Sequence, residues 1–200
     1  MGISAWLVPT TADSQRLDTA HLSKTSYPTF DPHVTLATNI PASIPPGDVR
    51  VAVGKSPHDM NARYPDSQAP TEGKFEVKFA NLETGEKYHQ SVYIRCKATP
   101  EILSLRDTFH ENLGIDVKTP LFPHLSLAYI EDEDAAQGER ERFLQELKKQ
   151  GRVRQTEDGA SVLCAPDLGE WVDGFEAAEV WIVKTTGPVK EWEVLDRIKL

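Results

Sequence analysis

The sequence predicts an α+β fold in which the two halves of the chain repeat one order of secondary-structure elements. Short apolar segments with alternating side chains predict strands, and segments with helical spacing lie between them. A histidine motif recurs once in each half, at the same place in that order. Of the 200 residues, 39% are apolar, which is enough to bury one core, so we expect residues 1–200 to form a single domain.

The first half opens with a strand, a helix and a second strand. Residues 3–8 form a short apolar run that Pro9 ends, which is typical of a strand. Residues 11–25 have helical spacing, and residues 33–38 form an alternating run rich in β-branched side chains. We therefore predict a β-α-β opening.

A proline-rich segment and a hairpin complete the first half. Residues 39–73 lack sustained periodicity, and we predict that they form a surface insertion able to act as a lid, in which residues 49–53 are a candidate strand. Residues 75–79 and 91–95 alternate and are joined across Gly85, so they predict a β-hairpin.

The second half repeats this order. We predict a helix, a strand, a charged helix and three further strands over residues 100–113, 124–130, 133–150, 161–163, 178–183 and 192–198. The matching order favours an internal duplication, although the two halves share little sequence identity.

The composition excludes several classes of protein. A net charge of −9 argues against a protein that clamps a long nucleic acid, because such binding needs an excess of Lys and Arg. Cys96 and Cys164 are too few and too isolated for a disulfide framework or a zinc site. No signal peptide and no membrane span are expected. We predict a cytoplasmic monomer that acts on a small molecule, with peripheral attachment to an organelle left open.

Two pentapeptides carry the candidate chemistry. Residues 32–36 read Pro-His-Val-Thr-Leu and residues 123–127 read Pro-His-Leu-Ser-Leu. Side chains alternate faces along a strand, so each motif presents a histidine and a hydroxyl residue on one face. If the apolar faces are covered by helices, the two polar faces can look at one another across a cleft and surround an anion. The candidate residues are His33, Thr35, His124 and Ser126.

This set of side chains suits the hydrolysis of a cyclic phosphate. One group must take a proton from the attacking water and another must protonate the departing sugar oxygen, and two histidines can divide these roles near neutral pH. The hydroxyls of Thr35 and Ser126 would donate hydrogen bonds to the phosphate oxygens. We expect no metal and no cofactor. A single His-x-Thr would indicate only a structural or surface histidine, and the duplication is what favours a functional site.

Other residues are weaker candidates. Trp6 and Tyr93 are candidate substrate contacts, although an aromatic residue in an apolar run is usually part of the core. Tyr129 lies five positions after His124, so it faces away from this histidine unless the strand ends or bulges before it. We expect the remaining histidines to lie outside the site, at the surface: His21, His58, His89 and His110. The acidic run 131–134 indicates the first turn of a helix and not a metal site.

The paired motifs resemble the two-histidine phosphoesterase superfamily, and in particular its cyclic phosphodiesterase branch from plants and yeasts. The resemblance covers nearly the whole chain and also rests on Ser4–Pro9, Phe30–His33, Gln90–Ile94, Phe122–Tyr129 and Trp192–Val194. It implies a bilobal α+β fold in which two antiparallel sheets, related by a pseudo-twofold axis, form a V-shaped cleft with helices outside.

The resemblance also implies an activity. Members hydrolyse ADP-ribose 1″,2″-cyclic phosphate to the 1″-phosphate, and nucleoside 2′,3′-cyclic phosphates to 2′-phosphates, without a metal. By this similarity His124 is the base that acts on water and His33 the acid at the leaving oxygen, and the reverse assignment stays open. Three alternatives remain: an RNA-end processing ligase or exonuclease of the same superfamily, a module that binds cyclic phosphates without cleaving them, and a metal-dependent hydrolase.

Overall fold

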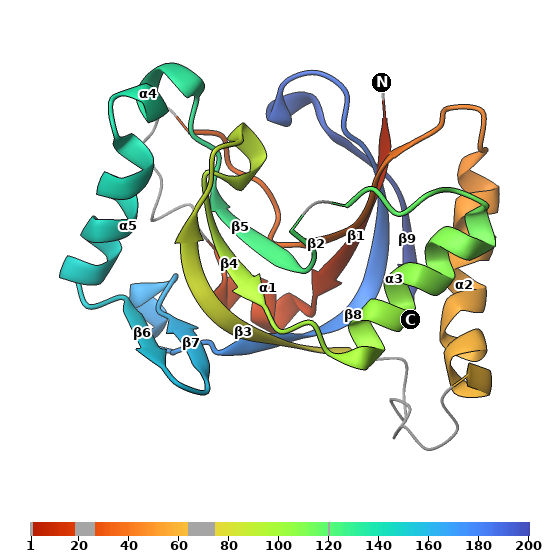
Figure 1. Cartoon of the computed structure of the whole chain (residues 1–200), viewed down its shortest axis with the longest axis horizontal. Coiled ribbons are helices and arrows are strands. Elements are labelled where there is room, and N and C mark those ends of the chain that lie inside the picture. Colours follow the sequence, from red (N-terminus) through yellow and green to blue (C-terminus); the bar gives the residue numbers. More distant parts are fainter. Residues whose placement is uncertain (1, 19–26, 64–74, 120) are drawn as a thin grey trace.

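The computed structural model describes residues 2–18, 27–63, 75–119 and 121–200, and only the backbone of residues 56–63 (Figure 1). The strands are β1 (Ile3–Pro9), β2 (Val34–Ile40), β3 (Phe75–Thr84), β4 (Val92–Cys96), β5 (His124–Ala128), β6 (Val153–Thr156), β7 (Gly159–Val162), β8 (Gly174–Lys184) and β9 (Glu193–Lys199). The helices are α1 (Thr11–Arg16), α2 (Pro46–Arg63), α3 (Pro100–Leu113), α4 (Asp132–Ala136) and α5 (Glu139–Lys149), with short 3-10 helices η1 (Tyr88–Gln90), η2 (Pro166–Leu168) and η3 (Val189–Glu191).

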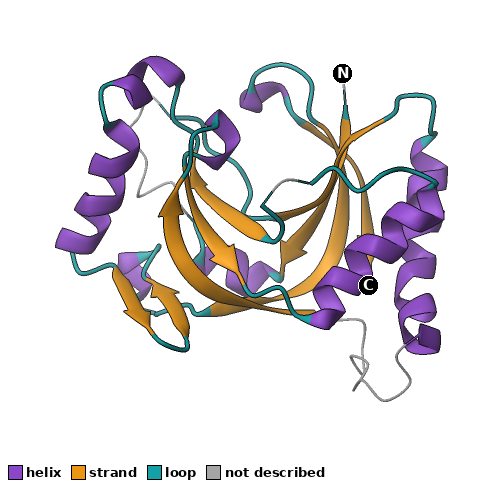
Figure 2. Ribbon diagram, viewed as in Figure 1, coloured by secondary structure: helices purple, strands orange, loops and turns teal. Residues whose placement is uncertain are grey.

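Seven of the strands form one antiparallel sheet that bends until it meets itself. The order is β1-β2-β5-β4-β3-β8-β9, and β1 also pairs with β8, so six strands form a ring and β9 extends it from β8. Figure 2 shows the strongly curved sheet with its helices outside. Strands β2 and β5 pair only at Val34 and Leu125, whereas β1 and β8 pair along their length. A separate hairpin joins β6 to β7.

The predicted α+β class and its antiparallel strands are therefore confirmed. The prediction of two separate large sheets is wrong. We expected two sheets, but β3 pairs with β8 and β2 pairs with β5, which joins the strands of both halves into one sheet. The division into two lobes related by a pseudo-twofold axis stays a prediction.

Helices cover the outer face of the sheet, where the apolar side chains of the strands lie. The helices α2 and α3 lie along one side and α5 along the opposite side (Figures 1 and 2). Residues from all three helices join the strands in one buried apolar cluster, in which Val53, Phe109 and Leu147 represent α2, α3 and α5. The strand side chains of this cluster point outward to the helices, so the alternate positions of β1, β2 and β5 are left for the concave face. Trp6 and Val8 of β1 belong to a second, smaller apolar cluster with Trp181 and Val183 of β8.

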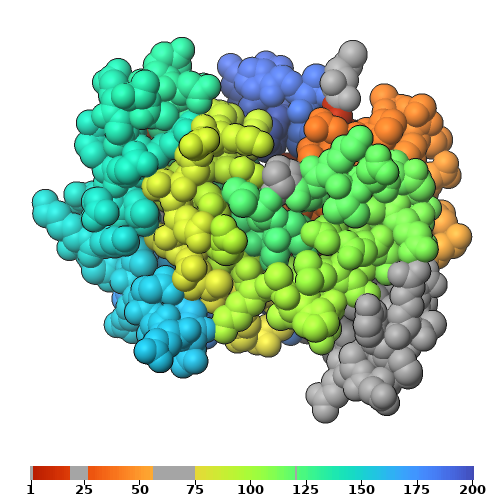
Figure 3. All heavy atoms as spheres, in the orientation of Figure 1, coloured from red at the N-terminus to blue at the C-terminus, as the bar shows by residue number. Residues whose placement is uncertain are grey.

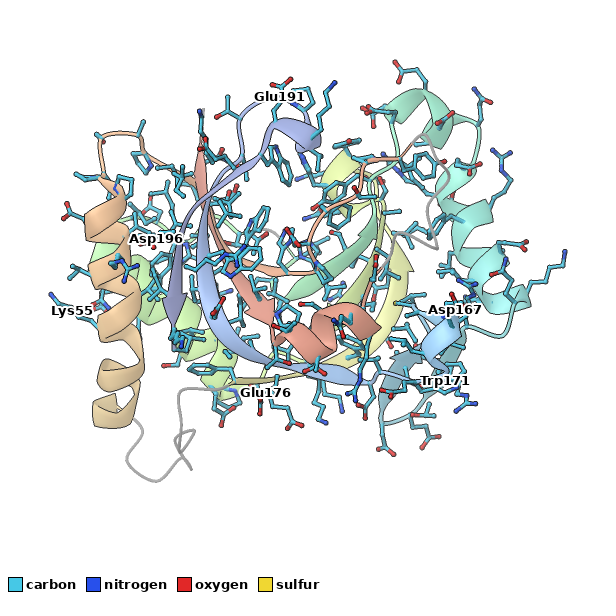
Figure 4. The ribbon with its side chains drawn as sticks, turned by 180° about the vertical axis from the view of Figure 1, so that it is seen from behind. Lys55, Asp167, Trp171, Glu176, Glu191 and Asp196 are labelled. Atoms are coloured by element: carbon cyan, nitrogen blue, oxygen red, sulfur yellow. The ribbon has the colours of Figure 1, made fainter. Side chains whose placement is uncertain are left out.

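The segment predicted as an insertion contains a long helix. Residues 49–53, which we expected as a strand, lie within α2, because Val49, Ala52 and Val53 have the spacing of one helix face and Pro46 suits a first helical turn. Asp196 of β9 accepts two hydrogen bonds from Arg50, and Figure 4 shows Asp196 on the side of the sheet that α2 covers. The described side chains of α2 do not line the pocket with the two motif histidines, and residues 64–73 lie outside the described chain, so the role of this segment as a lid stays a prediction.

Several other boundaries differ from the prediction. The charged helix predicted over residues 133–150 is divided into α4 and α5, because Gly138 has a φ of 80° between them. Strand β6 was not predicted, since its exposed polar residues lack an apolar face. The helix predicted over residues 11–25 is described only as α1, and residues 19–26 lie outside the described chain. The helix over residues 100–113 and the remaining strands are confirmed, with shifts at their ends.

Among the described residues, no helix combines the length and the hydropathy that crossing a membrane requires.

Candidate active site

The two histidine motifs meet where β2 and β5 pair. Val34 lies opposite Leu125 in an antiparallel register. Neighbouring positions of antiparallel strands run in opposite directions, so His33 lies across from Ser126 and Thr35 across from His124. The histidines are then diagonal neighbours, for which backbone separations of about 7–8 Å are usual. We expected the two strands to face one another across a cleft, and instead they are adjacent in one sheet, because the sheet closes between them.

All four motif residues line one pocket with a volume of about 290 Å³. In Figure 3 the pocket side of the molecule is hollowed between the segments around η1 (yellow) and η3 (blue). The lining comes from β1, β2 and β5, from the segments next to them, from the η1 segment between β3 and β4, and from the segment between β8 and β9: Ser4, Trp6, His33, Thr35, Thr38, Asn39, Lys87, His89, Gln90, Thr119, His124, Ser126, Tyr129, Thr185 and Trp192.

The described lining of the pocket carries no negative charge. The chain has 31 Asp and Glu residues and a net charge of −9, yet no described carboxylate lines this pocket, while one lysine and three histidines do. Among the described residues, no three His, Cys, Asp or Glu side chains are grouped in a way that could hold a metal ion. The site therefore presents nitrogen and hydroxyl groups to a bound molecule.

His33 is buried and its ring is fixed on two sides. Its Nδ1 lies 2.7 Å from the carbonyl oxygen of Asp31, and because a carbonyl only accepts, Nδ1 carries the hydrogen and Nε2 has the free lone pair. The ring stacks on Trp6 with centroids 3.8 Å apart. Burial lowers the pKa of His33 from 6.5 to about 4, with smaller contributions from the charges of His124 and His89, against the opposing effect of the Asp31 carbonyl.

His124 has a similar arrangement at the start of β5. Its Nδ1 lies 3.0 Å from the carbonyl oxygen of Leu121, which again leaves the lone pair on Nε2. The edge of its ring meets Tyr93 at a centroid distance of 5.5 Å, and Arg95 is its partner on β4. Burial lowers the pKa of His124, and the charge of Arg95 lowers it further, although the Leu121 carbonyl opposes them.

The two hydroxyl residues are not equivalent. The Ser126 hydroxyl donates to the carbonyl oxygen of His89 at 2.8 Å, so its hydrogen must turn away before it can donate to a phosphate oxygen. Thr35 makes no side-chain hydrogen bond with another described residue, so its hydroxyl can donate directly to a bound molecule.

The three aromatic candidates have different surroundings. Tyr129 follows the last residue of β5 and lines the pocket, as it would if the strand ended before it. Burial raises the pKa of Tyr129, so its phenol stays protonated and can donate a hydrogen bond. Trp6 belongs to a buried cluster and also lines the pocket beside His33. Tyr93 does not line the pocket: it packs against His124 and donates to Glu83 at 2.8 Å, which corrects its assignment as a substrate contact.

Sequence analysis missed nine of the fifteen pocket residues, among them His89, Lys87 and Trp192. His89, expected outside the site, lines the pocket from η1, and its ring stacks on Trp192 at a centroid distance of 5.6 Å. No periodicity marks it, because it lies in a short 3-10 helix between two strands. His110, expected at the surface, is buried in α3 and binds the Arg106 carbonyl through Nδ1.

The predicted surface positions of His21 and His58 are not tested, because the structure does not describe their side chains. His21 lies outside the described chain. His58 lies within the part of α2 for which only the backbone is described.

Arg140 of α5 supports the loop that carries η1 and the end of β5. Its buried guanidinium donates to the carbonyl oxygens of Gly85 and Ile130 at 3.1 and 3.2 Å. We expect Arg140→Met to lower the free energy of unfolding by at least about 1 kcal/mol, because the Gly85 carbonyl oxygen loses the guanidinium donor and the Ile130 carbonyl oxygen keeps only the Ser91 hydroxyl. Urea unfolding would measure this. Lys149→Met, at an exposed position of the same helix, is the matched control, and an equal effect of both substitutions would contradict this role of Arg140.

Comparisons with known proteins agree with the family resemblance of the sequence. A curated 2′,3′-cyclic-nucleotide 3′-phosphodiesterase of Kluyveromyces lactis is 28% identical over 215 residues, which cover 99% of this chain and 98% of that protein. A solved phosphoesterase structure has a TM-score of 0.51 at 9% identity, covering 100% of this chain and 98% of its own, and shares the fold. A structure of Escherichia coli LigT complexed with 3′-AMP has a TM-score of 0.49 at 10% identity, with 99% and 96% covered. The family model described as cyclic phosphodiesterase-like protein matches residues 1–200, and the chain belongs to this family.

Proposed function

We propose that this protein hydrolyses small cyclic phosphates without a metal, converting ADP-ribose 1″,2″-cyclic phosphate to the 1″-phosphate and nucleoside 2′,3′-cyclic phosphates to 2′-phosphates. The observation that carries the proposal is one pocket, without a described carboxylate, lined by two histidines and two hydroxyl residues from paired strands. Membership of the cyclic phosphodiesterase-like family and the name of the yeast relative support the same activity.

In the proposed reaction His124 is the base and His33 is the acid. Nε2 of His124 takes a proton from water, and the water oxygen forms a bond to phosphorus. The bond between phosphorus and the 3′-oxygen of a 2′,3′-cyclic nucleotide then breaks, and Nε2–H of His33 gives its proton to that oxygen. Both Nδ1 atoms face backbone carbonyl oxygens, so proton transfer is assigned to the two Nε2 atoms.

His33 must be protonated to act as the acid, but its lowered pKa disfavours the protonated form before the substrate binds. With a pKa of about 4, His33 is mostly neutral at pH 7. A phosphate monoanion beside the ring stabilises the charged form and raises its pKa, because an opposite charge in a buried site is strongly felt. In the proposed reaction, substrate binding therefore stabilises the protonated form of His33.

Three neutral donors are available for the developing charge on the phosphate oxygens. Thr35 lies across from His124, Ser126 lies across from His33, and Tyr129 stays protonated. Hydrogen bonds aimed at the pentavalent transition state stabilise it more than the ground state.

The product identifies the reaction. We expect incubation with 2′,3′-cyclic AMP to yield adenosine 2′-phosphate, seen by phosphorus NMR, at the same rate with or without EDTA. Formation of the 3′-phosphate would contradict the assigned direction of opening, and loss of activity in EDTA would contradict the metal-independent reaction. Tight binding without any product would instead establish a binding module.

A second substrate tests for RNA-end processing. We expect an oligonucleotide that ends in a 2′,3′-cyclic phosphate to react more slowly than the mononucleotide, because the chain has a net charge of −9 and offers little attraction to a long phosphate backbone. A faster reaction of the oligonucleotide would favour RNA-end processing.

A further inference from the structure

Lys87 is a cation at the site that the proposed reaction does not use. It lines the pocket beside the motif histidines, from the residue immediately before η1. Its side chain is exposed, and no carboxylate of the described residues forms an ion pair with it. Acidic residues outnumber basic residues in this chain, 31 to 22, yet no described carboxylate lines this pocket. The ammonium group of Lys87 can therefore attract a second anionic group of a bound molecule.

The turn that carries Lys87 is held in place by hydrogen bonds. The amide of Gln90 donates to the Lys87 carbonyl oxygen at 2.9 Å, and the Ser91 hydroxyl donates to the Tyr88 carbonyl oxygen at 2.7 Å. Ser126 donates to the His89 carbonyl oxygen and so links the turn to β5. The backbone at Lys87 therefore has a fixed position relative to the phosphate site, and only the lysine side chain must be ordered when an anion binds.

His89 lines the same pocket as Lys87 and the motif histidines. Its ring stacks on Trp192 and meets the edge of Tyr129, and it is close enough to His33 for the two rings to affect one another electrostatically. The short helices η1 and η3 lie at the same end of the molecule (Figure 1), and Glu191 of η3 lies at its outer edge (Figure 4). The charge of Glu131 acts on Tyr88 and His89, and Glu86 directly precedes Lys87 in the sequence, but neither of these acids lines the pocket.

We propose that Lys87 forms a subsite for a second phosphate group on the substrate. The enzyme would then favour cyclic phosphates that carry a further phosphate or diphosphate over those that end in a free sugar hydroxyl. This inference rests on the proposed function, because it places the cyclic phosphate between His33 and His124. The second phosphate would reach the mouth of the pocket, where the ammonium of Lys87 contacts it.

Binding of two related products tests the subsite. We expect the full chain to bind adenosine 2′,5′-bisphosphate about fivefold or more tightly than adenosine 2′-phosphate in low salt, measured by isothermal titration calorimetry. High salt should reduce this preference, because it screens an exposed ion pair. Lys87→Met should bring the ratio of the two dissociation constants close to one. Lys97→Met, an exposed lysine outside this pocket, should keep the wild-type ratio.

The outcomes separate this inference from the proposed function. Equal binding of the two nucleotides by the wild type, or an unchanged preference in Lys87→Met, would overturn the subsite. Hydrolysis of 2′,3′-cyclic AMP is assayed on the same preparations. A protein that prefers the bisphosphate through Lys87 and hydrolyses nothing would support the subsite and contradict the proposed function, whereas hydrolysis without the preference would do the reverse.

Discussion

Replacing either His33 or His124 with alanine is expected to lower kcat/KM for 2′,3′-cyclic AMP by at least ~100-fold, the usual cost of losing one acid–base group. Both side chains line the pocket, and each has Nδ1 bound to a backbone carbonyl, so each variant removes one positioned Nε2. Steady-state kinetics on the purified variants would measure the loss. Near wild-type turnover by either variant would contradict the catalytic assignment.

The control for these variants is another buried histidine with the same local hydrogen bond. His110 also has Nδ1 on a backbone carbonyl, 2.8 Å from that of Arg106, but it lies in α3 outside the pocket. We expect His110→Gln to retain activity, provided that circular dichroism shows all three variants to be folded. An equal loss of activity in His110→Gln would indicate that the histidine variants act through the fold and not through the chemistry.

The same variants can separate the acid from the base. In a 2′,3′-cyclic substrate whose 3′-oxygen is replaced by sulfur, the departing thiolate needs little protonation, because a thiol is far more acidic than a sugar hydroxyl. We expect this substrate to recover much of the loss in His33→Ala and little of the loss in His124→Ala. Recovery in His124→Ala alone would reverse the two roles.

Acid is expected to destabilise the protein through His33. Its pKa is 6.5 in an unfolded chain and about 4 in the fold, so between these values the unfolded state binds more protons than the native state. The stability associated with neutral His33 is therefore fully present above about pH 6.5 and is lost as the pH falls towards 4. The two pKa values correspond to a loss of about 2 to 3 kcal/mol by pH 4.5.

Urea unfolding at pH 7 and pH 4.5 would measure this loss. His33→Asn is the matched variant, because its amide can still donate to the Asp31 carbonyl but cannot titrate in this range. We expect the variant to lose about 2 kcal/mol less than the wild type between the two pH values. Equal losses would show that His33 is protonated in the native state at pH 4.5.

The local features of the site could be predicted from the sequence, because they depend on short-range periodicity. The alternation of side chains along a strand is enough to put His33 with Thr35 and His124 with Ser126, and the structure has both pairs in the pocket. The pairing of Val34 with Leu125 joins distant parts of the chain, and no local pattern specifies which strands are neighbours. The single sheet was missed for this reason.

Residues that reach the site from irregular segments could not be predicted. His89 and Lys87 belong to a turn whose position depends on Ser126 and Arg140, which are remote in sequence. Residues 49–53 illustrate a different difficulty, because a short run rich in valine fits a strand or a buried helix face, and its length does not decide between them. Only the packing of α2 on the core resolves this ambiguity.

The contact between β2 and β5 lies between the proposed acid and the proposed base. His33 directly precedes Val34 and His124 directly precedes Leu125, so the two imidazole rings lie on two different strands that are paired at one residue pair. Elsewhere β1 and β8 form an extended ladder. A small separation of β2 from β5 would increase the distance between the two proposed proton-transfer groups. The other strand pairs of the closed sheet could keep their register. The spacing on which the proposed reaction depends is therefore set at the pair Val34–Leu125, where two strands of the sheet share the fewest paired residues.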